Sequence, residues 1–292
     1  MSDLNIVAVG SSPLIAEEIR EITKSILAVP LPITTRTTAE VTAAEPHTFY
    51  VCATTQGETL AKRLPQKQLY VFGMEPTTKF FLDIAKIPAG ETVYVFNNLL
   101  PYTKILTERC QELGMTNLKF EPIAYEEMDG TEVAKRLQAA KYIIGVDIFV
   151  GDKVLQSAAY KKYLRPDVQI IAGTRTASVA SANRLLAAIG AYYYREYMNR
   201  LYALVDNKDE VMLKLISHDL GQMLEELQQS VLQTVTAQVG SKQKQPEEAE
   251  AHLPLTFTGD FSRDFHAVEA QLQELAELQH KIKTLVAQSD KR

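Results

Sequence analysis

The sequence predicts an α/β protein with two lobes, followed by a long helical extension. Three observations predict this fold class. Over residues 4–190, short β-branched or aromatic runs alternate with amphipathic stretches, which is the pattern of βα units around a mostly parallel sheet. A segment with two prolines, residues 74–90, falls midway between two sets of such runs. After Gly190, a stretch without proline carries one apolar stripe, which is typical of a long packed helix.

The alternating part divides into two sets of strands and helices. Strands are expected at residues 4–9, 49–53, 69–72, 93–96, 118–122, 142–150 and 168–172, with a weaker candidate at 31–35. Helices are expected at residues 13–27, 58–64, 77–84, 101–113, 131–140, 154–163 and 178–189. We therefore expect two Rossmann-like lobes with mostly parallel sheets, residues 1–80 and 81–190, connected near residues 74–90. Residues 178–189 are an open case, because this last helix could return to the first lobe.

Residues 191–292 are expected to form a helical hairpin or coiled-coil extension. Residues 192–239 read as one long helix with an apolar stripe formed by Leu201, Val205, Met212, Ile216, Met223, Leu227, Val231 and Val235. A flexible linker rich in Lys, Gln and Glu is expected at about residues 240–258, and a second helix begins at Ser262. Two antiparallel helices per chain would form a four-helix bundle in a homodimer. The alternative is an extension that folds back on its own globular part.

Composition excludes several classes of protein. The 292 residues include 46% hydrophobic residues, enough for a core, and their net charge of -5 gives no electrostatic reason to bind nucleic acid directly. The two cysteines, Cys52 and Cys110, fit reduced core residues, so neither a disulfide nor a metal site is expected. We also expect a cytoplasmic location without membrane contact, since no apolar run approaches 20 residues and the amino terminus lacks a signal peptide.

Two turns in the first lobe carry polar residues where a strand meets a helix. Ser11 and Ser12 follow the first strand, and a helix amino terminus attracts a carboxylate or phosphate. The turn lacks both the three-glycine dinucleotide fingerprint and the phosphate-loop lysine, so no cofactor is expected. Thr54, Thr55 and Gln56 follow a later strand in the same way, and strand ends are where open α/β sheets bind ligands. In both turns, ordinary helix capping is the alternative.

Comparable turns occur in the second lobe. Arg175 is a candidate for binding a carboxylate or phosphate with its planar guanidinium, although it also fits an ordinary surface arginine. The asparagines and the aspartate are as common in turns as in ligand sites. The candidate ligand-binding residues here are Asn97, Asn98, Asp147, Thr174, Arg175 and Ser178.

The sequence shows no constellation typical of catalysis. A serine elbow, a paired-histidine metal motif and a Cys–His grouping are not legible, so an enzyme is not expected. One motif keeps an alternative open: residues 217–224 contain His218 followed by Asp219 and Gln222, and they resemble the His-Asp-x-x-Gln box of one class of sensor histidine kinases. That resemblance implies a phosphoacceptor histidine, whereas a solvated helix histidine is the simpler interpretation.

The order of segments in residues 1–190 resembles the cytoplasmic sensor half of PrpR-type transcriptional activators, named for propionate catabolism. The resemblance rests on the turn at residues 54–59, on residues 143–151 with Ala158 and Ala159, and on the glycine, serine and alanine-rich helix of residues 173–188. The chain lacks the arginine that the family has in the first of these turns. The resemblance implies a two-lobed, periplasmic-binding-protein-like sensor domain.

These observations favour a cytoplasmic ligand-sensing regulatory protein. We expect a small, anionic metabolite in a cleft between the lobes, with closure about residues 74–90 passed through the helical dimer to a transcriptional or signalling partner. The alternatives are a phosphorelay protein that uses His218 and a non-catalytic structural adaptor.

Overall fold

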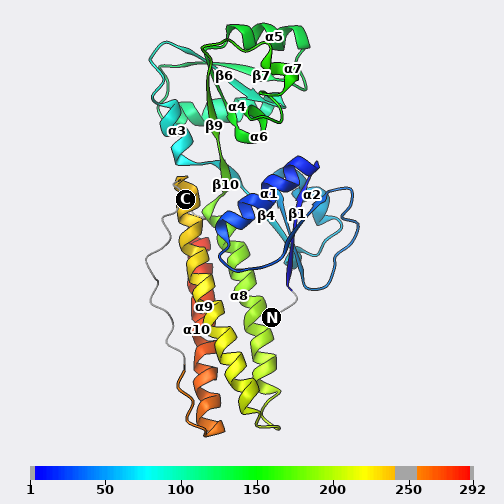
Figure 1. Ribbon diagram of the computed structural model, residues 1–292, viewed down its shortest axis with the longest axis vertical. Coiled ribbons are helices and arrows are strands. Elements are labelled where there is room, and N and C mark those ends of the chain that lie inside the picture. Colours follow the sequence, from blue (N-terminus) through cyan, green and yellow to red (C-terminus); the bar gives the residue numbers. More distant parts are fainter. Residues whose placement is uncertain (1–3, 241–254, 290–292) are drawn as a thin grey trace. The chain divides into compact units, whose positions relative to one another are not determined.

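The computed structural model describes residues 4–240 and 255–289. The described residues fold as two compact units: unit 1 comprises residues 4–74, 177–237 and 255–289, and unit 2 comprises residues 75–176 with 238–240. Each unit contains one parallel four-stranded sheet. The α/β fold with parallel sheets and added C-terminal helices is therefore confirmed. Figure 1 labels the elements along the chain.

Unit 1 begins with a sheet in the order β2-β1-β3-β4. Its strands match the expected runs within two residues, including the weaker candidate, which forms the edge strand β2. The elements are β1 (Asn5–Gly10), α1 (Pro13–Ile26), β2 (Ile33–Thr37), β3 (Thr48–Ala53), α2 (Thr54–Ala61), a 3-10 turn (Gln66–Gln68) and β4 (Leu69–Phe72).

Alternating residues of the central strands are buried on opposite faces of this sheet. Ile6 and Ala8 of β1 belong to a core shared with α1 and the C-terminal helices. Val7 and Val9 belong to a second core with Leu60 of α2. Since successive side chains of a strand point to opposite faces, this arrangement buries both faces, as a parallel sheet requires.

Unit 2 has the sheet order β7-β6-β8-β9. One face is covered by α3 and α4, whose Phe80, Ile84 and Leu106 pack with Val93 and Val95 of β6. The elements are α3 (Thr78–Ile84), β6 (Thr92–Asn97), α4 (Leu100–Glu112), β7 (Lys119–Ala124), α5 (Gly130–Ala139), β8 (Tyr142–Val146), α6 (Asp147–Val150), α7 (Ala158–Lys161) and β9 (Gln169–Gly173). The chain passes between the units in β5 (Met74–Pro76) and β10 (Arg175–Ala177), which pair as a two-stranded sheet.

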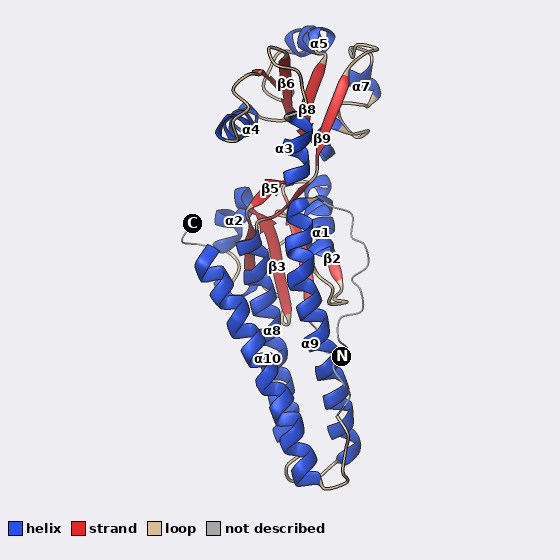
Figure 2. Ribbon diagram, turned by 90° about the vertical axis from the view of Figure 1, so that its left-hand side faces the viewer, coloured by secondary structure: helices blue, strands red, loops and turns tan. Residues whose placement is uncertain are grey.

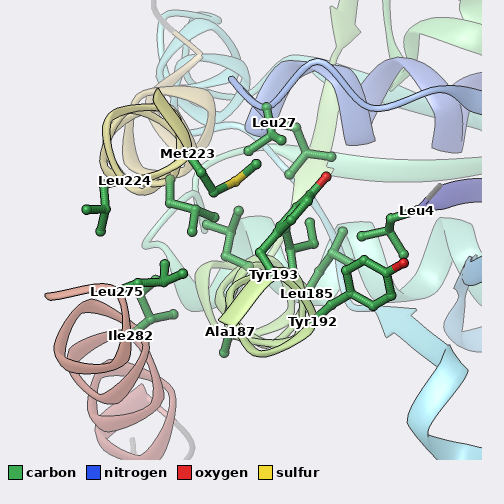
Figure 3. Packing of buried hydrophobic residues seen from close by; sticks show 14 of the residues in the cluster. Leu4, Leu27, Leu185, Ala187, Tyr192, Tyr193, Met223, Leu224, Leu275 and Ile282 are labelled. Carbon is green, nitrogen blue, oxygen red and sulfur yellow. The ribbon is translucent and has the colours of Figure 1, made fainter. Parts of the chain in front are cut away.

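Three long helices complete unit 1: α8 (Val179–Tyr202), α9 (Glu210–Val239) and α10 (Phe261–Ser289). Figure 2 shows them running side by side. They share the core that covers the first sheet. In Figure 3, Leu185 and Tyr193 of α8, Met223 of α9, and Leu275 and Ile282 of α10 lie in this one apolar cluster.

The structure answers the open case of the last helix of the α/β part and differs from the expectations for the C-terminal part. Residues 177–190 belong to unit 1, which is the alternative left open for residues 178–189. Residues 191–237 and 255–289 join the same unit rather than forming a separate extension. The single helix expected at 192–239 is wrong, because the chain turns at residues 203–209, where Lys208 has a φ of 49°. Most of the expected linker lies outside the described residues.

The apolar stripe expected to form a dimer core is therefore divided. Leu201, Ile216, Met223 and Leu227 are buried within the chain, as the fold-back alternative requires. Val205, Met212 and Val235 are exposed. A coiled-coil homodimer stays a prediction that would use only the exposed part of the stripe.

Candidate functional site

The carboxyl edge of the sheet in unit 1 brings together the polar turns expected there. Strands β1 and β3 are parallel neighbours, and β4 is next to β3. Ser11 and Ser12 therefore follow one strand end directly beside Thr54, which follows the next. This edge of an open α/β sheet is where ligands bind. We call the first turn of α2, residues 54–57, the α2 turn.

The turn after β1 serves the fold. The hydroxyl oxygen of Ser12 accepts a hydrogen bond from the N–H of Ile15 at 3.4 Å, and its carbonyl accepts from Ala16 at 3.0 Å, so Ser12 caps α1. A side chain at Gly10 would meet the backbone nitrogen of Ala16 at 2.2 Å. Only glycine lets α1 start this close to the strand. The hydroxyl of Ser12 therefore caps α1, as the alternative to ligand binding expects. The side chain of Ser11 is exposed.

The α2 turn has no such cap. Helix α2 begins at Thr54, directly after β3, four residues earlier than the helix expected at 58–64. Its N-cap residue is Ala53, no side chain caps the helix, and no acidic residue lies in its first turn. The first N–H groups of a helix have no partner inside the helix, and its dipole favours negative charge there. The residues expected to be a loop thus form an open helix amino terminus.

Gln56 makes the α2 turn unusual. Only 8% of its surface is exposed. Its Nε2 donates to the hydroxyl oxygen of Thr55 at 2.6 Å, while its Oε1 is buried and has no hydrogen-bond partner among the described residues. If the amide were turned over, Nε2 would be the atom without a partner. A buried polar group left unpaired costs about 1–3 kcal/mol, so its presence at a strand end requires an explanation.

Contacts connect the α2 turn to the start of α8. A side chain at Gly57 would meet Cγ2 of Val71 at 3.1 Å, so α2 packs directly on β4. At the end of β4, the N–H of Gly73 donates to the Ser181 hydroxyl at 3.0 Å, and its carbonyl accepts from the N–H of Ser178 at 2.7 Å. Ser178 also caps α8 by accepting from the N–H of Ser181. Ser178, a candidate ligand residue, therefore joins the sheet to α8.

In unit 2, the turn after β6 already contains an anion. The N–H of Leu100, the first residue of α4, donates to Oε2 of Glu127 at 2.6 Å. Glu126 lies 3.4 Å from the side-chain nitrogen of Asn98. Asn97 accepts from the N–H of Asn98 with its own Oδ1 at 2.8 Å. Since two carboxylates disfavour a further negative charge, the arrangement favours the turn-forming role of both asparagines over anion binding.

The other candidates of unit 2 follow neighbouring strands. Asp147 comes directly after β8, where its Oδ1 accepts from the N–H of Ile148 at 2.8 Å. The carbonyl of Thr174, after β9, accepts from the N–H of Thr77 at 3.0 Å. Arg175 is the half-buried first residue of β10. Whether these residues and the α2 turn share one ligand stays a prediction.

An aromatic cluster beside these turns was missed in the sequence. Phe96 and Tyr125 stack with ring centroids 5.1 Å apart, and Phe149 and Tyr160 lie about 6 Å from Tyr125. Burial, followed by the neighbouring Glu126, raises the pKa of Tyr125, so its phenol stays neutral. The rings come from β6, the turn after β7, α6 and α7, and no local spacing indicates that they meet.

His218 lies on the exposed side of α9. Its neighbour Ser217 points inward and donates to Oε1 of Gln271 on α10 at 2.8 Å. Among residues 4–240 and 255–289, no group of three His, Cys, Asp or Glu side chains is placed to hold a metal ion. No helix of the described chain is both long and apolar enough to cross a membrane.

Comparison with known proteins adds no relative: no family model matches the chain, and no curated protein or solved structure matches it. The resemblance to PrpR-type sensor domains stays a prediction.

Proposed function

We propose that this protein is a ligand-sensing regulator whose metabolite binds at the α2 turn. The observation that carries the proposal is the buried, unpaired amide atom of Gln56 at an uncapped helix amino terminus. A ligand that reaches this atom would supply the missing hydrogen bond. The unpaired amide atom then costs stability in the free protein, and the bound ligand removes that cost.

The chemistry of the turn favours a small hydroxylated anion, such as a hydroxy acid or a sugar phosphate. The uncapped N–H groups and the helix dipole suit a carboxylate or phosphate. A hydroxyl group both donates and accepts, so it pairs with Gln56 whichever way the amide is turned. Thr55 and the exposed Ser11 offer further hydroxyls at the same edge.

The contacts from α2 to α8 support a regulatory role for this binding. Ligand contact with the α2 turn would act on Val71, on Gly73 and then on the serines that start α8. Helix α8 extends 24 residues from that point. A ligand can shift such an arrangement only by binding its two states with different affinity. The exposed apolar residues Val205 and Met212 would then contact a second copy or a protein partner.

Paired ligands that differ by one hydroxyl test the site. L-malate is compared with succinate, and L-lactate with propionate, by thermal shift and by calorimetry. We expect the wild-type protein to bind the hydroxylated member about tenfold more tightly, the value of one good hydrogen bond. In Gln56→Met this preference should disappear. The matched control is Gln228→Met, which changes an exposed glutamine on α9. An unchanged preference in Gln56→Met contradicts the proposal. The proposal is also contradicted if no compound in a panel of hydroxy acids and sugar phosphates binds the wild-type protein.

The exposure of His218 favours phosphotransfer as the second candidate function. Incubation with acetyl phosphate or a kinase should then add one phosphoryl group, visible in the intact mass and absent in His218→Gln. A structural adaptor, the third possibility, predicts neither ligand stabilisation nor phosphorylation.

A further inference from the structure

A pocket lies in unit 1, at the amino ends of β3 and β4 and so at the opposite edge of the sheet from the α2 turn. It has a volume of about 720 Å³, within the range of small-molecule sites. Its walls come from the segment before β3, from the start of β4, from α8 and from Gln279 of α10. We call it the amino-edge pocket.

One wall of the amino-edge pocket is aromatic. The rings of Phe49 and Tyr70 lie 4.9 Å apart, and Phe49 and Tyr192 meet edge-on at 6.3 Å. His47 continues the row, with its ring 5.9 Å from that of Tyr192. Such a row offers a flat apolar ligand both ring faces and ring edges.

The charges around the pocket favour an anion. Arg195 and Lys67 line it with exposed side chains. Glu45, the acidic residue of the lining, is neutralised by Arg36, whose Nη1 lies 2.5 Å from its carboxylate. Burial raises the pKa of Tyr70 to about 12, against the opposing effect of Arg195. The Tyr70 phenol is therefore neutral at physiological pH and adds no negative charge.

His47 is held in an uncommon backbone conformation at the pocket. Its φ is 50°, in the left-handed region that non-glycine residues seldom adopt. Its carbonyl accepts from the N–H of Asn5 at 2.8 Å, which explains the position of the backbone. The side chain is fixed separately, because Nδ1 lies 2.8 Å from the Tyr192 hydroxyl. Strained residues of this kind concentrate at functional sites.

We infer that the amino-edge pocket binds a small organic anion with a flat aromatic body. The aromatic row packs against the ring system, while Arg195 and Lys67 pair with the acidic group. This site is separate from the α2 turn, which offers hydroxyls and a helix amino terminus but no described aromatic row. The inference stands on the pocket alone and does not depend on the function proposed above.

Calorimetric titration with 2-naphthoate and its neutral analogue 2-naphthamide tests this inference. We expect the wild-type protein to prefer 2-naphthoate. Arg195→Gln and Lys67→Gln should each weaken the binding of 2-naphthoate roughly three- to tenfold and leave the affinity for 2-naphthamide nearly unchanged. Arg263→Gln, which removes the same charge from an exposed site on α10, is the matched control and should change neither affinity.

A blocking variant locates the site independently of charge. Ala191 lines the pocket from α8, so Ala191→Phe should abolish binding of both compounds while circular dichroism and the melting temperature show a folded protein. Gln56→Met should leave both affinities unchanged, which separates this site from the α2 turn. The inference is overturned if the wild-type protein binds neither compound at millimolar concentration, if Ala191→Phe still binds them, or if 2-naphthoate keeps its full advantage after both charges are removed.

Discussion

The N–H of Gly73, at the end of β4, donates a hydrogen bond of 3.0 Å to the hydroxyl oxygen of Ser181 in the first turn of α8. The two residues are 108 positions apart in the chain. Their bond attaches the helix that leads away from the sheet to the strand against which α2 packs. It is the step that connects the α2 turn with the helical part of unit 1.

Ser181→Ala removes this bond and leaves the N–H of Gly73 without its side-chain acceptor. Ser181 is 3% exposed, so we expect a loss of about 1–3 kcal/mol in the free energy of unfolding of unit 1. Urea denaturation followed by circular dichroism measures it. Ser262→Ala, at an exposed position of α10, should change the stability by much less. Equal effects of the two variants would show that the Gly73 bond contributes nothing.

Gln56→Met is expected to stabilise the protein in the absence of ligand. The variant keeps a side chain of similar length and removes the buried amide atom that has no partner among the described residues. Relief of that desolvation cost should raise the free energy of unfolding by up to about 1–3 kcal/mol. A destabilised variant would indicate that the amide already has its partners in solution, and the site argument would lose its basis.

Gly145→Ala should destabilise unit 2. The added Cβ would lie 2.5 Å from the carbonyl oxygen of Phe96 and 2.6 Å from Cγ1 of Val150. Since the oxygen belongs to the neighbouring strand backbone, it cannot move away freely, and overpacking of this kind costs about 1–3 kcal/mol. Gly130→Ala, at the first residue of α5, is the matched control because its Cβ would meet nothing within 4 Å. Unchanged unfolding of Gly145→Ala would contradict the strand packing described here.

The two cysteines report on the two units separately. Cys52 lies in unit 1 and Cys110 in unit 2, and burial raises the pKa of each thiol to about 12. Because the thiolate is the reactive form, neither should react with a disulfide reagent in the native protein at pH 8. Labelling followed by peptide mass spectrometry should show Gly145→Ala accelerating modification of Cys110 and not of Cys52. Rapid native labelling of either cysteine would refute its burial.

Asp264 should make the C-terminal helix sensitive to acid. Its carboxylate accepts from the N–H groups of Thr258 and Gly259, and the bond to Thr258 is the largest cause of its lowered pKa. A lowered pKa means that the stabilisation is present above the unfolded pKa of about 4 and is lost as the pH falls through the folded value. Asp264→Asn should therefore be less stable than the wild type at pH 7 and nearly equal to it at pH 2. A stability difference between the wild type and Asp264→Asn that stays constant with pH would exclude this pH-dependent contribution. The variant Asp206→Asn, at an exposed position, controls for the loss of a negative charge.

Periodicity was sufficient to predict the strands of the two four-stranded sheets, because nearly every central strand is a run of β-branched or aromatic residues buried on both faces. It did not indicate the short strands β5 and β10, which pair as a separate sheet. It failed where a short apolar run changes structure partway. Residues 142–150 read as one strand, yet the chain leaves β8 at Val146 and forms α6. Gly145 marks the change, since its bare backbone allows the close approach of Phe96 and Val150. The helix expected at 154–163 is reduced to α7.

The long helices show a second limit of sequence patterns. The stripe from Leu201 to Val235 continues through residues 203–209, so it gives no sign that the chain reverses there. The polar run from Asp206 to Asp209 is a local signal of a turn, but it is shorter than the apolar stripe around it. The burial of Met223 within the core of unit 1 depends on tertiary packing, which no stripe specifies.

The candidate site was predicted in part. The rule that ligands bind at strand ends identified the α2 turn correctly as a polar strand end, but it did not distinguish the capped Ser12 from the uncapped Thr54. Which hydroxyl serves as a cap depends on the backbone geometry at the helix start, which the residue types alone do not specify. The amino-edge pocket had no local signal either, because His47, Tyr70 and Tyr192 come from three distant segments.

Hydrogen exchange measured by mass spectrometry, with and without L-malate, tests the central claim most directly. Binding at the α2 turn should slow exchange in peptides covering residues 54–60 and, through Gly73 and Ser181, in peptides at the start of α8. Peptides of α5 serve as the internal reference. Exchange that is unchanged in both segments, or slowed only elsewhere, would contradict a sensing site at this turn.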